Sequence, residues 1–256
     1  MIGQKNLIKK LKSYTINNLP HSIVLIGENG SEEKEVCNFI SNYFNLSQFD
    51  LTDFVSKEMI DEIYTCHTAT LYVIDISKLD ERKQNILLKF YEEPNDYTYI
   101  ILLCESDNDI IDTIKTRSYT FKKDIYKKED LVSLISNIPQ EDISTVLNIC
   151  HTPGQIEIAN HTDIKSLYNL CVNIIDSMSK ASYQNSLTIA DKINYKDNYD
   201  KYDLNIFIKM MRYVSFIKGR CDIYKLLIEL CHNLNSMNNK QNRVENFITQ
   251  WWLLCK

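Results

Sequence analysis

Residues 27–34 read GENGSEEK and have the outline of a phosphate-binding loop. A short apolar run at 23–26 leads into it, and a helical pattern of apolar residues leads out. A strand, a glycine turn and a helix N-terminus form a site whose backbone amides hold phosphate. That pattern also needs a second glycine, a lysine and a serine or threonine, and these places hold Glu32, Glu33 and Lys34. The sequence therefore predicts the setting of a nucleotide site without its phosphate-binding side chains.

The charges of this loop argue against tight ATP binding. The carboxylates of Glu32 and Glu33 would face a polyphosphate, and like charges about 4 Å apart repel by on the order of 1–4 kcal/mol. The missing lysine removes an attraction of similar size, so the loop keeps little more than Gly27 and Gly30. Lys34 is an alternative cation, but helical geometry turns its side chain about 100° away from the preceding position. We expect no bound nucleotide cofactor.

A second group of residues follows another buried apolar run. Residues 71–74 predict a strand that ends in Asp75. In an active P-loop ATPase, a strand aspartate holds the magnesium shell and a nearby glutamate polarises the attacking water. The residue after Asp75 is Ile76, which can neither orient nor deprotonate water. An aspartate at a strand end often caps the next turn, and we expect that structural role for Asp75, the remnant of a nucleotide site.

The elements that position these residues alternate along the first half of the chain. Strands are predicted at 23–26, 71–74, 99–103 and 119–121, and helices at about 5–16, 33–45, 56–64, 80–91 and 110–115. Apolar strands alternating with helices indicate an α/β fold with a parallel sheet covered on both faces. After about residue 123 only helices are predicted, at 128–138, 141–151, from Pro153, and at 164–179, 183–193, 204–218, 222–236 and 241–254.

Composition narrows the class of protein. The net charge of −5 over 256 residues argues against DNA binding by this chain alone. Eight cysteines without CxxC spacing indicate reduced, buried thiols in a cytoplasmic protein, and we expect no metal site. The pairs Cys66-His67, Cys150-His151 and Cys231-His232 cannot chelate alone, because adjacent side chains point apart. Met1 leads directly into an amphipathic pattern, so we expect no signal peptide, and the apolar runs are too short to span a membrane.

Residues 71–75 read LYVID, and residues 84–94 read QNILLKFYEEP. These two blocks resemble the clamp-loader branch of the AAA+ ATPases, and within it the delta-prime subunits of bacterial DNA polymerase III. Further similar blocks are Ile2-Gly3-Gln4, Pro20-His21-Ser22, the segment 113–118 and Thr152-Pro153-Gly154. The resemblance covers about residues 1–160, and the last third is similar only in being helical.

The resemblance implies a fold and the loss of a catalytic site. It implies an AAA+ type P-loop domain with a degenerate phosphate loop at 1–123, a small helical lid domain at 124–162 and an all-α, collar-like domain at 163–256. Cys104 stands where ATPase relatives place a polar residue near the γ-phosphate. Gly154 stands where hydrolysing subunits carry a lid arginine. With the loop and Ile76, four parts of one ATP site are missing, which implies a subunit that does not hydrolyse ATP. The zinc-binding cysteine cluster of many relatives is also missing, so no zinc is expected.

Arg117 is the exception. In the family, the arginine of the Ser-Arg-Cys motif reaches into a neighbouring subunit's ATP site, and this chain has Thr116-Arg117-Ser118. A guanidinium there would neutralise charge on the γ-phosphoryl group, an effect worth roughly 10³–10⁵ in rate in arginine-finger systems. The alternative is a surface arginine in an ordinary salt bridge, which contributes little.

The prediction is a non-hydrolysing delta-prime-like subunit of a sliding-clamp loader. Its partners would be the clamp-loader ATPase subunits and a delta-type subunit, with the sliding clamp and primed DNA reached through the complex. Two alternatives stay open: a divergent AAA+ ATPase that binds nucleotide weakly through Gly27, Gly30 and Lys34, and an AAA+-derived interaction module outside replication. Near the end of the chain, one of Trp251 and Trp252 is expected in the core and the other in the core or at a subunit interface, because adjacent helical residues face different ways.

Overall fold

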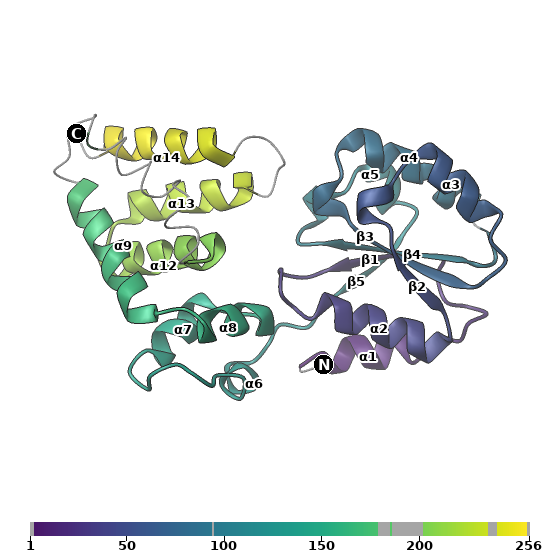
Figure 1. Cartoon of the computed structure of the whole chain (residues 1–256), viewed down its shortest axis with the longest axis horizontal. Helices are drawn as coiled ribbons and strands as arrows, with labels where there is room; N and C mark the ends of the chain where they lie inside the picture. Colours follow the sequence, from purple (N-terminus) through teal and green to yellow (C-terminus); the bar gives the residue numbers. More distant parts are fainter. Residues whose placement is uncertain (1–2, 94, 179–184, 186–201, 235–239, 255–256) are drawn as a thin grey trace. The chain divides into compact units, whose positions relative to one another are not determined.

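The computed structural model describes residues 3–93, 95–178, 185, 202–234 and 240–254 (Figure 1). The chain forms two compact units, residues 1–130 and residues 131–256. The first contains the sheet and its helices, and the second is helical. The three-domain division expected at residues 123 and 162 stays a prediction.

The first unit is built on five parallel strands in the order β2-β3-β4-β1-β5. Their bounds are β1 Ser22–Ile26, β2 Ser47–Asp50, β3 Thr70–Asp75, β4 Thr98–Cys104 and β5 Tyr119–Lys122. The three central strands β1, β3 and β4 are rich in Val, Ile and Leu, as expected where both faces of a parallel sheet are covered. Because all strands run the same way, every carboxyl end lies at one edge of the sheet and every amino end at the other.

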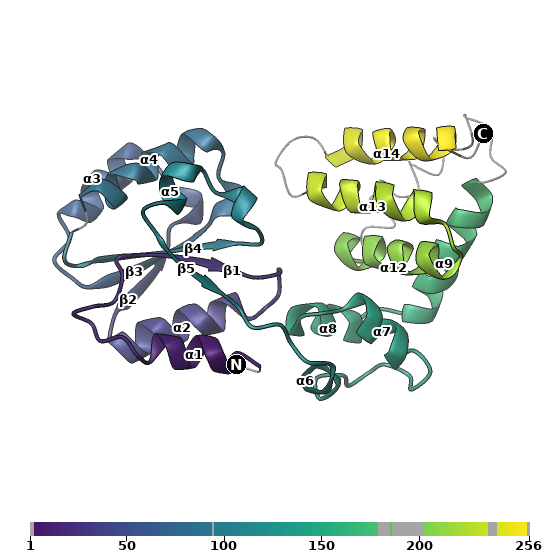
Figure 2. The same ribbon diagram turned by 180° about the vertical axis from the view of Figure 1, so that it is seen from behind.

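Successive residues of the central strands alternate between two hydrophobic cores. Ile23 and Leu25 pack on one face of the sheet, and Val24 between them packs on the other. Helices α1 Lys5–Leu11 and α2 Glu33–Phe44 cover the first face. Helices α3 Lys57–Tyr64, α4 Glu81–Glu92 and α5 Asp112–Lys115 cover the second, as Figures 1 and 2 show from opposite sides. The predicted parallel sheet with helices on both faces is confirmed.

The helix starts in this unit follow ordinary capping chemistry. Ser56 accepts a hydrogen bond from the backbone amide of Met59 at the start of α3. Asp80 accepts one from the amide of Lys83 at the start of α4. These side chains supply partners for amides that have none within the helix.

Three elements differ from the predictions. Strand β2 was missed, because its four residues are all exposed and show no apolar pattern. Helix α1 ends at Leu11 rather than near residue 16, since the Asn18 carboxamide accepts from the Thr15 amide at 2.6 Å and holds a turn there. Helix α6 ends at Val132 rather than near residue 138. The Asn160 carboxamide bonds the Leu134 carbonyl and the Ser136 amide and so takes backbone groups that a longer helix would use.

The second unit consists of packed helices in the described residues. Their bounds are α6 Lys128–Val132, which crosses the boundary, α7 Ile143–Ile149, α8 Pro153–Asn160, α9 Ile164–Met178, α12 Leu204–Ile217, α13 Cys221–Leu234 and α14 Lys240–Leu254. Helix α12 packs on α9 and α13, and α13 packs on α14 (Figure 1). Trp251 is fully buried and packs against Phe247, so one tryptophan lies in the core as expected, and Trp252 is half-buried. Of the helix predicted at 183–193, all but residue 185 lies outside the described residues.

Candidate functional site

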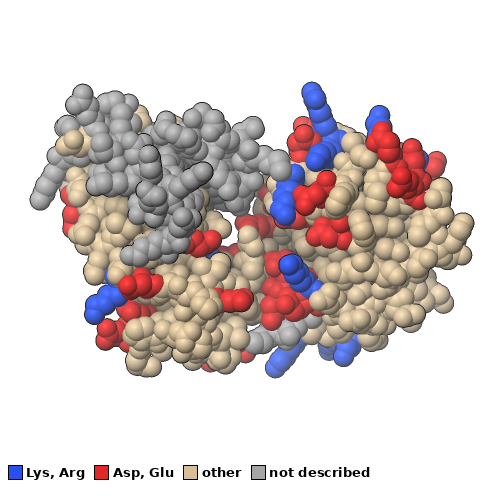
Figure 3. Space-filling model, in the orientation of Figure 1, with Lys and Arg blue, Asp and Glu red and all other residues tan. Residues whose placement is uncertain are grey.

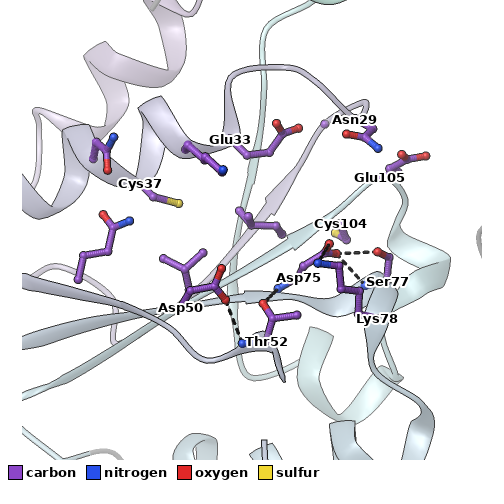
Figure 4. A pocket seen from close by; sticks show the side chains of 16 residues that line it. Asn29, Glu33, Cys37, Asp50, Thr52, Asp75, Ser77, Lys78, Cys104 and Glu105 are labelled. Carbon is purple, nitrogen blue, oxygen red and sulfur yellow. Dashed lines mark hydrogen bonds and ion pairs between the residues drawn. The ribbon is translucent and has the colours of Figure 1, made fainter. Parts of the chain in front are cut away.

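A pocket of about 360 Å³ lies at the carboxyl edge of the sheet in the first unit (Figure 4). Its walls are the loop after β1, the first turns of α2 and the residues at the ends of β2, β3 and β4. In open α/β sheets this edge is where ligands bind. We call this cavity the carboxyl-edge pocket, and the loop of residues 27–34 the glycine loop.

The backbone of the glycine loop turns through two residues with positive φ angles. Gly30 and Glu32 have φ angles of 79° and 59°, in the left-handed region. Glu32 stands where the phosphate-binding pattern requires its second glycine, which is free to adopt this conformation. A residue with a side chain adopts it at a cost of about 1–2 kcal/mol. Helix α2 begins at the next residue, Glu33.

The residue that follows β5, Lys123, is inserted beneath this loop. The Lys123 ammonium lies 2.8 Å from the Glu33 carboxylate and 2.8 Å from the Ser31 hydroxyl, and its side chain is 2% exposed. A Cβ added to Gly27 would collide with Cδ of Lys123, so only glycine leaves room for the lysine stem. Burial lowers the pKa of Lys123, and the hydrogen bond with Glu33 opposes that shift.

Sequence reasoning missed Lys123, although one signal was present. Lys123 follows β5, and its amide continues the ladder by donating to the Ile26 carbonyl at 2.8 Å. Strand residues alternate between faces, so Lys123 falls on the same face as Phe121, which is buried under α1 and α2. That alternation places a lysine toward the core beside the glycine loop.

Tyr126 closes the loop from a second side. Its hydroxyl lies 2.9 Å from the Ser31 carbonyl and 3.3 Å from the Glu32 carboxylate, and its one proton can be donated to either oxygen. Burial raises the pKa of Tyr126, and the nearby Glu32 charge adds to that shift. The phenol therefore stays a donor at neutral pH. Glu32 and Glu33 have different partners, Tyr126 for the first and Lys123 for the second.

Asp75 is engaged at the end of β3. Its carboxylate accepts from the Ser77 amide at 3.1 Å and the Ser77 hydroxyl at 2.6 Å, and so caps the short 3-10 helix Ile76–Lys78 (Figure 4). The Lys78 ammonium lies 3.8 Å from the same carboxylate. Ile76 is 1% exposed and belongs to the hydrophobic core. The place of a water-polarising glutamate is therefore filled by a core side chain.

Two buried thiols border the pocket. Burial raises the pKa of Cys37 to about 12 and that of Cys104 to about 12, so both are neutral thiols at physiological pH. Cys104 follows Leu103 at the end of β4, with its sulfur 3.9 Å from the Leu25 carbonyl. Neutral thiols with such pKa values are poor nucleophiles.

Lys34 is among the residues that line the pocket, and its substitution for the missing lysine stays untested. The pocket extends along α2 to Cys37 and Asn38, which share a helix face with Lys34 at spacings of three and four residues. Four carboxylates line the pocket (Glu33, Asp50, Asp75 and Glu105) against two ammonium groups (Lys34 and Lys78), a difference of two negative charges.

Gly154 is the second residue of α8 in the other unit and supplies no side chain.

Arg117 lies at the opposite edge of the sheet from the pocket. It precedes β5, whereas the pocket residues follow the ends of parallel strands. Its guanidinium donates to the Thr113 carbonyl at 3.1 Å and lies 4.0 Å from Glu92. The arginine is 42% exposed and Glu92 is 60% exposed. Arg117 therefore cannot reach the pocket of its own chain.

The remaining expectations concern cysteines, charge and membranes. Among the described cysteines, four are buried as expected, but Cys66 is half-buried and Cys221 is exposed. Acidic and basic residues lie interspersed over the face shown in Figure 3. No helix in the part of the chain that the structure describes has the length and apolar character to cross a membrane.

The strand order, the glycine loop after β1 and the pocket at the carboxyl edge define a P-loop fold of AAA+ type. The family model described as DNA polymerase III, delta subunit matches residues 51–125. Among solved structures, a DNA polymerase III gamma subunit-related protein from Thermotoga maritima is similar over 99% of this chain and 100% of its own, with 14% identity and a TM-score of 0.50. The family match covers 75 of the 256 residues, and the likeness to the solved structure is one of fold.

Two structures of RuvB point variants from Thermotoga maritima are also similar. One has 15% identity and a TM-score of 0.48, over 83% of this chain and 71% of its own. The other has 15% identity and a TM-score of 0.49, over 99% of this chain and 88% of its own. Among curated proteins, none matches the chain.

Proposed function

We propose that this chain is a non-hydrolysing, delta-prime-like subunit of a sliding-clamp loader in DNA replication. The observation that carries the proposal is the ion pair of Glu33 with the buried Lys123, because Glu33 stands at the place of the phosphate-binding lysine. Ile76 in the core and the neutral Cys104 support the same conclusion. The Glu33–Lys123 pair removes a contribution to phosphate binding, Ile76 removes one to water activation, and Cys104 removes one to contact with the γ-phosphate.

The position of Arg117 supports a role toward a neighbour. Its guanidinium is partly exposed, and its contacts, one carbonyl and a carboxylate at 4.0 Å, are weak enough to exchange. Since the chain's own pocket lies at the other edge of the sheet, an ATP that Arg117 contacts belongs to another subunit. The proposed partners are the clamp-loader ATPase subunits and a delta-type subunit, with clamp and primed DNA bound by the cytoplasmic complex.

Reconstitution with the cognate ATPase subunit tests this proposal. Arg117→Ala should lower the DNA-stimulated ATPase rate of the complex while the complex stays assembled. Lys115→Ala is a matched control, because it removes a positive charge from the same short segment. An unchanged rate with Arg117→Ala would refute the trans role, and failure of the chain to join the complex would refute the subunit assignment.

One observation favours a second candidate, weak nucleotide binding. The carboxyl-edge pocket retains about 360 Å³, and Lys34 lies in its wall. A direct titration of the isolated chain with ATP and magnesium separates the two candidates. Micromolar affinity with turnover would favour a divergent ATPase. We expect no binding, because acidic side chains outnumber basic ones around the pocket.

A further inference from the structure

One oxygen of Glu33 is surrounded by donors of the glycine loop. Its Oε1 accepts from the Ser31 backbone amide at 3.2 Å and lies 3.0 Å from the Ser31 hydroxyl. The Lys123 ammonium lies 2.8 Å from the same oxygen. The serine hydroxyl has one proton, which it can give to Glu33 or to the nearby Glu28 carbonyl, while it accepts from Lys123.

These donors are the kinds that bind phosphate oxygens. A loop amide, a hydroxyl and a buried ammonium make an anion site of the sort that holds phosphates in proteins. Here the anion is supplied by the chain and the cation comes from the end of β5. In an active loop the lysine stands at the position of residue 33 and the anion is the bound phosphate. Here residue 33 is itself the anion, and the cation is Lys123.

We infer that the Glu33 carboxylate is an internal ligand that fills the anion site of the glycine loop, and that this site, with Lys123 as its cation, accepts a polyphosphate once the carboxylate is removed. The inference rests on the proposed function in treating the loop as a former nucleotide site. It requires no partner subunit, because Ser31, Glu33 and Lys123 belong to one unit of one chain.

The surroundings of Lys123 explain why an anion must be present. The lysine side chain is 2% exposed and its stem lies against Gly27. A buried ammonium is stable only when it is paired and hydrogen-bonded. Ser31 is itself 2% exposed and is held from the other side by Tyr126, so the donors stay in place when Glu33 changes.

The test uses the full chain and inorganic pyrophosphate as the probe. We compare the wild type with Glu33→Ala, which removes the internal ligand, and with Glu35→Ala, which removes the same charge from an exposed position of the same helix turn. Pyrophosphate affinity is measured by calorimetry, and the unfolding temperature is measured with and without the ion. Glu33→Ala should bind pyrophosphate at least tenfold more tightly than the other two, and only its unfolding temperature should rise with the ion.

Two further variants keep the test decisive. Glu33→Ser also removes the carboxylate and leaves the site empty, and serine is well tolerated at the start of a helix, so this variant reports on the site if Glu33→Ala does not fold. Glu33→Ala combined with Lys123→Met should lose the gained binding, because the cation is gone. Equal pyrophosphate affinity in the wild type and in folded Glu33 variants would overturn the inference. So would binding that survives the loss of Lys123. Either result would leave the assembly and ATPase tests of the clamp-loader role unaffected.

Discussion

The Lys123 ammonium lies 2.8 Å from the Glu33 carboxylate, across 90 residues of sequence, and the pair joins the end of β5 to the start of α2. The lysine is 2% exposed and the glutamate 23% exposed. Water therefore screens the two charges weakly. Each charge is stabilised in its buried place by the other.

Removing the cation should destabilise the first unit. Lys123→Met leaves Glu33 without its partner, which costs about 3–5 kcal/mol in fully buried pairs. Because Glu33 is 23% exposed, we expect about 2–3 kcal/mol, measured as the free energy of unfolding in urea. Lys122→Met, at the neighbouring and 71% exposed position, should change it by less than about 0.5 kcal/mol. Similar losses for both variants would contradict a specific pair.

Alkaline pH should weaken the fold through its buried thiols. The pKa of Cys37 and that of Cys104 are each raised from 9.0 to about 12 in the folded chain, mainly by burial. A raised folded pKa gives stability that is complete below pH 9.0 and is lost as pH rises toward about 12. At pH 10 the loss in the free energy of unfolding is about 1.4 kcal/mol per thiol. The pKa of Lys123 is lowered from 10.5 in the folded chain, so this group adds stability as the pH rises toward 10.5 and partly offsets the loss.

The measurement for this prediction is the free energy of unfolding between pH 8 and pH 10.5. Cys37→Ala should make the decline less steep, because position 37 then has no thiol to ionise in the unfolded chain, while Cys104 still contributes. Cys221→Ala, at an exposed thiol, should keep the wild-type slope. If the slopes of all three proteins agree, Cys37 does not contribute to the pH dependence.

The left-handed conformation of Glu32 should favour glycine. Glu32→Gly and Glu32→Ala both lose the contact with Tyr126, so their difference reports on the backbone alone. We expect the glycine variant to be more stable than the alanine variant by about 1 kcal/mol. Chemical denaturation of the two variants measures this difference. Equal stabilities would show that the loop relaxes out of the conformation with φ of 59°.

The Arg117–Glu92 contact should matter little to the isolated chain. Both side chains are well exposed and their atoms are 4.0 Å apart, so Arg117→Ala and Glu92→Ala should each change the unfolding free energy by less than about 1 kcal/mol. In the reconstituted complex only Arg117→Ala should reduce the ATPase rate. An equal reduction by Glu92→Ala would indicate that the carboxylate orients the arginine.

The sequence predicted the central sheet because burial leaves a strong pattern. Strands β1, β3 and β4 are apolar on both faces, and each was found near its observed bounds. Strand β2 is an outer strand of the sheet and has no buried residue, so its sequence shows no apolar pattern. The mixed charges of the glycine loop were visible, but the partner of Glu33 comes from a strand 90 residues away. A local pattern cannot identify which distant charge completes a site.

The parallel arrangement of the strands has one more consequence. Arg117 precedes β5 and Lys123 follows it, so a strand of four residues, about 13 Å long, separates the two ends. Substitutions more than about 7–10 Å apart with no shared partners usually have additive effects, so variants at the two ends can be assayed independently.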